Sequence, residues 1–282
     1  YGLPVGGTKT DVAGFSVEQV RTYYDRYYSP ENAVLAVAGD FDPEKLQHFI
    51  QQTFNTIPRK EHPLSFEASH SEISTAATPQ PPIHLHEPGS TSFIEAVYPI
   101  PESQHPNIPA LDVMDAILSV GRNSRFYQTL IEPGLASHVG SYSAALIEPG
   151  WYDISVTLTP GETLKTVDEV LLKTISTLQD DRVSDEELQR AKAQLMAHFI
   201  MSSRDIDAQA SQLAYNQTVA GDYYFSDRYL ERIQQVTVAD IQRVAQTYLK
   251  VSQRTVGYFE PTESDGQEGL AGVSPQQTSE DF

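Results

Sequence analysis

Hydrophobic residues recur at helical and strand-like spacing over the first sixty residues of the chain. Ser16 opens a capping box with Gln19, and apolar residues then repeat at helical spacing as far as Tyr27. The apolar run 33–38 predicts a buried strand, and Pro43 stands at the first position of a second helix. The apolar stripe of that helix consists of Leu46, Phe49, Ile50 and Phe54. The pattern therefore predicts a loop, a helix, a strand and a helix over 1–60.

A second compact unit is predicted from residue 83 onward. Ser184 and Glu187 form another capping box. His84 and His86 are two positions apart, a spacing that places both side chains on the same face of a strand. The apolar pattern predicts strands at 93–99, 136–147, 152–158 and 255–259, and helices at 108–118, 124–131, 163–178, 185–203, 208–219, 227–234 and 238–248.

Two segments lack a periodic apolar pattern. Residues 61–82 are polar and rich in Ser, Thr and Pro, which is typical of an extended linker between domains. Residues 262–282 are acidic and rich in Gly, Ser and Gln, and we expect a disordered tail there. The expected organisation is the truncated end of a first domain at 1–60, a linker at 61–82, a second domain at 83–261 and the tail.

The two ends of the chain resemble each other. Residues 15–37 align without a gap with residues 236–258 at an offset of 221, so that Ser16 meets Thr237 and Tyr27 meets Tyr248. Both copies predict a capped helix that ends in an aromatic residue, then a polar turn and a buried strand. Chance is the alternative, because helix–turn–strand units are common. A true repeat implies that about 140 residues of the first copy are absent before Tyr1.

The composition and charge of the chain limit the classes of molecule that we expect it to bind. With 282 residues the chain makes one large domain or two smaller ones. Its 19 Lys and Arg against 38 Asp and Glu give a net charge of −19, so we expect no nucleic-acid or membrane partner. No apolar run approaches the ~18 residues of a membrane span, and no signal peptide is recognisable. The absence of cysteine excludes disulfides, thiolate zinc sites and cysteine nucleophiles.

The residues alone show no complete active site. None of the eight histidines belongs to an HExxH or inverted HxxEH motif, and neither a GxSxG elbow nor a Gly-rich phosphate loop is present. His84 and His86 could share a metal if a third ligand came from elsewhere, while a solvated strand edge is the alternative.

Several stretches in the right order resemble one family, the M16 (pitrilysin-type) zinc metallopeptidases, which include the mitochondrial processing peptidases. Residues 1–46, with YYSPEN at 27–32, resemble the end of that family's first domain. In the second part, GRNSRFY at 121–127, GLA at 134–136 and ELQRAKAQL at 187–195 resemble the family's G-x-x-S-R-L-Y/F, G-L-A and E-L-x-x-A-K-x-x-L segments.

The resemblance implies an α+β fold, with two homologous domains that each have an antiparallel sheet and helices packed on one face. It also implies that the zinc ligands come from an HxxEH helix and a later glutamate in the first domain, upstream of Tyr1. We therefore expect no catalytic residue and no metal ligand in this chain, although the intact enzyme would hold zinc. The corresponding helix of the second domain, 108–118, offers only Asp112 and Asp115.

The family's second domain often supplies an Arg and, seven residues later, a Tyr that hold the substrate carbonyl near zinc. The GLA segment aligns these positions with Leu130 and Ser137, so the pair is lost. Arg125, Tyr127 and Tyr142 are weak candidates for substrate contact, with surface or packing roles as the alternative. The loss implies a zinc-bearing type of subunit or a non-catalytic member.

The predicted function is that of the C-terminal, non-zinc-binding part of an M16 metallopeptidase subunit, in which zinc-activated water would cleave peptides in the intact enzyme. A scaffold or partner subunit without catalysis is the alternative, and no feature favours a small-ligand binding module. Expected partners are a peptide substrate, for which the negative charge favours basic sequences, and a homologous subunit or a second copy of the chain. The bacterial cytoplasm or periplasm is favoured over an organelle.

Overall fold

The structure is a computed structural model that describes residues 5–58 and 81–262. The chain divides into two compact units, Tyr1–Ala68 and Ser69–Phe282, which are considered one at a time. Nearly all of the expected linker and the whole of the expected tail after Thr262 lie outside the described residues. No helix in the described ranges is long and apolar enough to cross a membrane.

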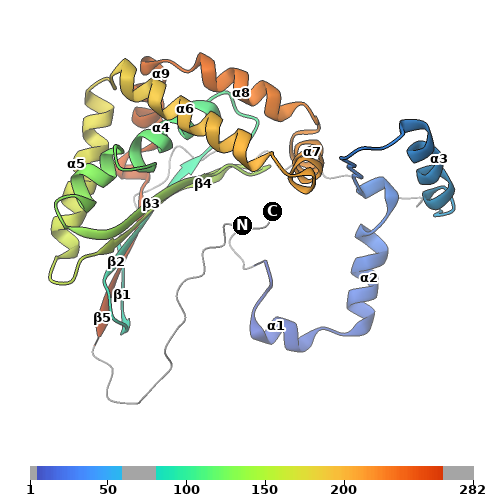
Figure 1. Cartoon of the computed structure of the whole chain (residues 1–282). Helices are drawn as coiled ribbons and strands as arrows, with labels where there is room; N and C mark the ends of the chain where they lie inside the picture. Colours follow the sequence, from blue (N-terminus) through green and yellow to red (C-terminus); the bar gives the residue numbers. More distant parts are fainter. Residues whose placement is uncertain (1–4, 59–80, 263–282) are drawn as a thin grey trace. The chain divides into compact units, whose positions relative to one another are not determined.

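The second unit is built on a mixed sheet of five strands with the order β1-β5-β2-β4-β3 (Figure 1). The strands are β1 (Ile83–Pro88), β2 (Phe93–Ile100), β3 (Ala136–Ala144), β4 (Gly150–Leu158) and β5 (Thr255–Thr262). Neighbouring strands are antiparallel, as expected, except for β1 and β5, which run parallel. The reason is geometric. Since β1 and β2 run in opposite directions and β5 lies between them, β5 must be parallel to one of the two.

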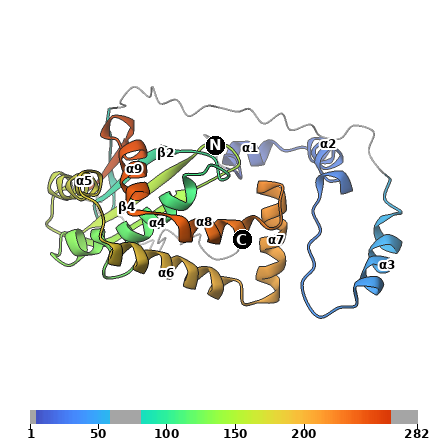
Figure 2. The same ribbon diagram turned by 90° about the horizontal axis from the view of Figure 1, so that it is seen from above.

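Helices cover one face of this sheet, as the two views in Figure 1 and Figure 2 show. They are α4 (Ile108–Ser119), α5 (Leu164–Asp180), α6 (Asp185–Ser202), α8 (Phe225–Gln235) and α9 (Val238–Tyr248), with α7 (Ile206–Ala220) linking α6 to α8. Alternate residues of β2 point into the core beneath them and are fully buried: Ile94, Ala96, Tyr98 and Ile100. Nine of the twelve residues of α4 are buried, so this helix is the centre of the core.

A buried ion pair joins α5 to the start of β5. Arg254 donates to both carboxylate oxygens of Asp168, with Nη1 lying 3.1 Å from Oδ2. The Tyr258 hydroxyl donates to the same Oδ2 at 2.8 Å. The side chains of Arg254 and Asp168 are only 5% and 14% exposed. Because both charges are removed from water, loss of either partner would leave the other uncompensated.

Within residues 5–58, the described part of the first unit, there are three α-helices and no buried core. They are α1 (Lys9–Gly14), where a loop was expected, α2 (Val17–Tyr27) and α3 (Pro43–Phe54), and none has a buried residue. The strand expected at 33–38 was wrong, because the structure has no strand there and Val34 and Leu35 are 44% and 58% exposed. A strand requires a hydrogen-bonded neighbour, and none lies beside this run among the described residues.

The internal repeat is visible in the element boundaries. The α2 helix and the short turn at Pro30–Asn32 match α9 and the turn at Val251–Gln253 in length and at the same offset of 221 residues. Both helices begin with a complete capping box. After the turn the two copies differ, because the second copy continues into β5, which has a strand on each side. The structure therefore supports the repeat through the helix and the turn.

Asp168→Asn should lower the free energy of unfolding by about 3 kcal/mol, because Arg254 would keep a buried charge without its counterion. Urea unfolding followed by the fluorescence of Trp151, the one tryptophan of the chain, measures the loss. The matched control is Glu169→Gln on the same helix, whose exposed pair with Lys165 spans 3.9 Å and should change stability by less than about 0.5 kcal/mol. Equal effects of the two substitutions would refute the role given to the buried pair.

Amide hydrogens of α2 should exchange with solvent much faster than those of α4 in the 282-residue chain. The reason is that α2 buries no side chain, whereas α4 is enclosed on all sides, and local opening is cheapest where few apolar contacts are lost. Hydrogen exchange followed by mass spectrometry compares the two helices in one sample. Equal protection would show that α2 is covered in solution.

Candidate functional site

Arg125, in the turn after α4, forms an ion pair with Glu187 at the start of α6. Its Nε and Nη2 donate to the two carboxylate oxygens of Glu187 at 3.0 and 3.3 Å. Glu187 also accepts the backbone N–H of Ser184 and so completes the cap of α6. Burial would raise the pKa of Glu187, but the bonds from Arg125 and Ser184 hold it below the usual value. These contacts favour a structural role for Arg125.

Tyr127 lines a hollow at the outer edge of the sheet, which we call the β3-edge hollow. It has a volume of about 250 Å³ and lies between the end of α4, the π-helical turn Tyr127–Ile131 and the start of β3. Its lining consists of Ser119, Gly121, Arg122, Tyr127, Ile131, Ser137, His138 and Val139. Of the three predicted contact residues, the structure brings Tyr127 to this hollow but not Arg125 or Tyr142, which lies further along β3 and is 52% exposed.

The two positions aligned with the lost Arg–Tyr pair cannot replace it. Leu130 is fully buried and has no polar group. The Ser137 hydroxyl donates to the Thr157 carbonyl at 3.3 Å. The register of β3 against β4 shifts between Ala136 and His138, so Ser137 is the extra residue of a β-bulge. Bulges redirect side chains at strand edges, and this one lies where His138 meets the hollow.

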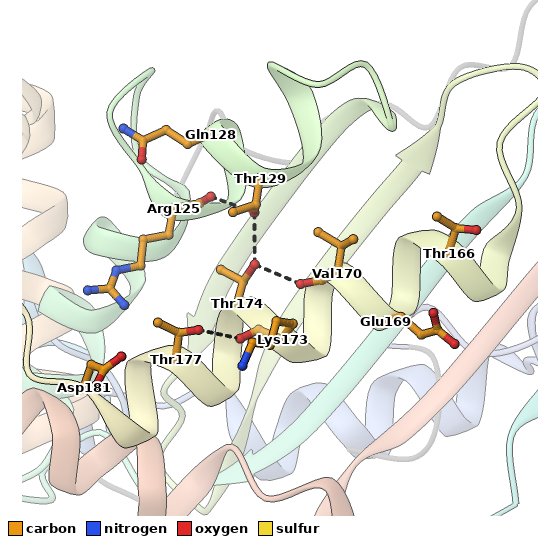
Figure 3. Close-up of a pocket in the computed structure, with 10 residues that line it drawn as sticks. All are labelled: Arg125, Gln128, Thr129, Thr166, Glu169, Val170, Lys173, Thr174, Thr177 and Asp181. Carbon is orange, nitrogen blue, oxygen red and sulfur yellow. Dashed lines mark hydrogen bonds between the residues drawn. The ribbon is translucent and has the colours of Figure 1, made fainter.

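A larger hollow of about 580 Å³ lies on the helical side, between the turn at 125–129 and α5 (Figure 3). Most of its hydroxyl groups are already bonded. Thr174 Oγ1 lies 2.9 Å from the Val170 carbonyl oxygen and 3.0 Å from Thr129 Oγ1, and Thr177 donates to the Lys173 carbonyl at 2.9 Å. Figure 3 shows Asp181 and Glu169 at opposite ends of the hollow. No converging set of reactive groups is formed here by the residues that line it.

The two aspartates of α4 lie in a buried hydrogen-bond network. Asp112 accepts a 2.5 Å bond from the Tyr229 hydroxyl, and Asp115 accepts bonds from Ser141 at 2.5 Å and Tyr152 at 2.8 Å. Burial raises the pKa of each carboxyl to about 6, although the hydroxyl donors oppose the shift. The carboxylates are thus held as acceptors inside the core rather than presented to a ligand.

A pair of carboxyl groups on the sheet was missed by the sequence analysis. Glu95 on β2 and Asp153 on β4 belong to strands that pair directly, and the two side chains are hydrogen-bonded to each other. Burial raises the pKa of Glu95, and the neighbouring Asp153 raises it further. Burial also raises the pKa of Asp153. The only sequence signal was an acidic residue inside each of two predicted strands.

The predicted histidine pair has other contacts. His84 and His86 both lie on β1, as expected, with the His84 ring 5.1 Å from that of Tyr258 and His86 Nδ1 3.4 Å from Glu260 Oε2. No group of three or more His, Asp or Glu side chains that could hold a metal is found in the part of the chain that the structure describes.

Residues 14–195 match the family described as the peptidase M16 inactive domain, which is more than half of the chain. The chain belongs to this family. Zinc protease PqqE of Helicobacter pylori is 22% identical over 261 residues, covering 90% of this chain and 57% of that protein. The family resemblance and the α+β fold expected from the sequence are therefore confirmed.

Solved structures share the fold of this M16 chain. A protease from Helicobacter pylori gives a TM-score of 0.78 at 21% identity, with 90% of this chain and 62% of that chain covered. The peptidase M16 inactive domain from Pseudomonas fluorescens gives 0.73 at 19% identity, with coverage of 92% and 61%. The M16 chain thus spans less than two thirds of the length of these relatives.

The described residues of the M16 chain do not fit the zinc that its relatives' names imply. Zinc sites in proteins require three or four converging N, O or S ligands. The α4 helix contains no histidine, and one oxygen of Asp112 and one of Asp115 already accept bonds from tyrosine or serine hydroxyls. No catalytic step through zinc can be assigned to these residues.

Asp112→Asn should change how stability depends on pH. A carboxyl whose pKa rises from 3.8 to about 6 on folding stabilises the fold while it is protonated, and that contribution is lost as the pH rises through 6. The wild-type chain should therefore lose about 1 kcal/mol more than the variant between pH 5 and pH 8.

Urea unfolding at a series of pH values measures this difference, which is independent of any constant offset caused by the new amide. Asp205→Asn, at an exposed helix start without a side-chain cap bond, is the matched control and should keep the wild-type pH profile. The interpretation is wrong if the Asp112 variant also keeps that profile.

Proposed function

We propose that this chain is the non-zinc-binding part of an M16 zinc protease whose intact form hydrolyses peptides. One observation carries the proposal: the chain matches the M16 inactive domain, and a relative named a zinc protease is 1.8-fold longer than the region aligned, since only 57% of it is covered. The zinc-binding residues would then lie in a part of the protein, or in a partner, that the described residues do not include.

The first unit supports this arrangement. Its helix and turn repeat those that precede β5 in the second unit, and its apolar residues Val34, Leu35 and Val37 are exposed. We therefore assign 1–60 to the end of a domain homologous to 83–261, with 61–82 as the link between them. In that domain the run 33–38 would be a strand with a partner on each side, as β5 is in the second unit.

A homologous partner chain is part of the proposal. Catalysis requires the substrate carbonyl to be held in register with the attacking water, and a charged or hydroxyl donor usually does this. Leu130 is buried and apolar, and the Ser137 hydroxyl is engaged with a backbone carbonyl, so neither supplies that donor. An Arg and a Tyr at these positions of a homologous chain would supply it, and the net charge of −19 favours basic peptides as substrates.

The second candidate is a scaffold subunit without catalysis. It is favoured by the α4 aspartates, whose hydrogen bonds serve the core alone. A scaffold would bind homologous M16 chains without contributing to hydrolysis.

The purified 282-residue chain should contain far less than one zinc per molecule and should not hydrolyse a fluorogenic basic peptide, because no group of ligands converges in its described residues. Elemental mass spectrometry and fluorescence measure the two properties. Mixing with a homologous zinc-binding M16 chain should produce hydrolysis above that of the partner alone.

Complex formation without any gain in hydrolysis would instead support the scaffold. One tightly held zinc per chain would contradict the assignment, and His84→Ala with His86→Ala would then identify the ligands.

A further inference from the structure

The β3-edge hollow presents hydrogen-bond donors and no carboxylate. Its polar lining consists of Arg122, Tyr127, His138 and the hydroxyls of Ser119 and Ser137. The chain as a whole carries twice as many acidic as basic residues, 38 against 19. The lining of the hollow includes a guanidinium, an imidazole and a phenol but no carboxyl group, and the carboxyl of Asp115 lies nearby, with its Oδ1 3.4 Å from the Ser119 hydroxyl.

Among these donors, the Ser119 and Ser137 hydroxyls already donate to the backbone carbonyls of Asp115 and Thr157, whereas the side chains of Arg122 and Tyr127 have no partner among the described residues. Arg122 follows Gly121, whose φ of 79° turns the chain away from α4, and it has no ion pair among the described residues. The nearby Arg125 differs, because Glu187 occupies two of its donors. The hydroxyl of Tyr127 likewise makes no hydrogen bond within the described ranges.

The third donor, His138, lies at the start of β3. The bulge at Ser137 precedes it, and its Nε2 lies 3.4 Å from where a Cβ on Gly140 would be, which is an ordinary van der Waals distance. The exposed imidazole therefore lies along the strand and lines the hollow.

The size and chemistry of the hollow select a small anion. Its volume of about 250 Å³ is below the range of roughly 300–1,000 Å³ that encloses drug-sized ligands, so it can hold the end of a larger molecule. A guanidinium fork matches the two oxygens of a carboxylate, and neutral donors complete such a site. The hollow also lies beside β3, an edge strand of the sheet. An extended peptide that lay along this edge could place its C-terminus in the hollow.

We propose that the β3-edge hollow binds the C-terminal carboxylate of a peptide, with Arg122 as the charged partner and Tyr127 and His138 as hydrogen-bond donors. The proposal rests on the proposed function only in taking a peptide as the source of the carboxylate. It requires neither zinc nor hydrolysis, so it can be tested on the chain by itself.

The test is a titration of the ¹⁵N-labelled chain with three acetylated peptides, followed by NMR. The first is Ala-Ala-Ala with a free C-terminus, the second is its C-terminal amide, and the third is Ala-Asp-Ala amide, which carries its carboxylate on a side chain. The first peptide should shift the amide signals of residues 121–127 and 137–139, and the two amides should bind at least fivefold more weakly.

Variants locate the site. Arg122→Gln should weaken binding of the free acid at least fivefold, and Tyr127→Phe and His138→Gln should each weaken it about twofold to threefold. Lys173→Gln, which removes one exposed positive charge at the other hollow, is the matched control and should leave the affinity unchanged. Circular dichroism checks that each variant is folded.

Equal affinity for the acid and its amide would overturn the proposal, and so would equal affinity for the side-chain carboxylate. Loss of binding in Lys173→Gln but not in Arg122→Gln would also overturn it. Failure of the mixing experiment to produce hydrolysis would refute the proposed function, yet it would leave the outcome of this titration unchanged.

Discussion

The second unit depends on the insertion of its last strand between its first two. β1 and β2 are neighbours in the sequence, but β5, which follows α5 to α9 along the chain, pairs with both of them. β1 pairs with no other strand, and the buried pair of Arg254 with Asp168 joins the start of β5 to the helical layer. The sheet, the helical layer and the ion pair therefore form together, because none is complete without contacts between residues about 90 to 170 positions apart.

The same constraint explains the first unit. Its α2 helix and following turn copy α9 and the turn before β5, so the run 33–38 stands where a central strand would begin. A central strand needs hydrogen-bond partners on both sides and apolar cover on its faces. Without them the run forms no strand, and Val34, Leu35 and Val37 stay exposed. Local sequence is enough for the helix and its cap, but not for the strand.

The polar groups of the second unit fall into two classes. Asp112 and Asp115 on α4 accept hydrogen bonds from tyrosine and serine hydroxyls inside the unit. Arg122, Tyr127 and His138 lie instead at an open edge, where α4 ends and β3 begins. Ligand chemistry is thus concentrated at the edge of the sheet, whereas the centre of the unit serves stability.

Apart from α1, which formed where a loop was expected, the α-helices of the described residues followed from the sequence to within about two residues at their starts, because a cap or an amphipathic stripe depends on residues within about four positions of one another. Ser16, Ser184 and Thr237 each begin a helix where the pattern predicted one, and the strands β2 and β4 show the expected alternation. The parallel pairing of β5 with β1, the missing strand at 33–38 and the separation of Tyr127 from Arg125 and Tyr142 did not follow from it. Those features were decided by the tertiary structure, because they depend on contacts between segments that are far apart in the sequence. Examples are the strand pairings, the Arg125–Glu187 contact and the β3-edge hollow.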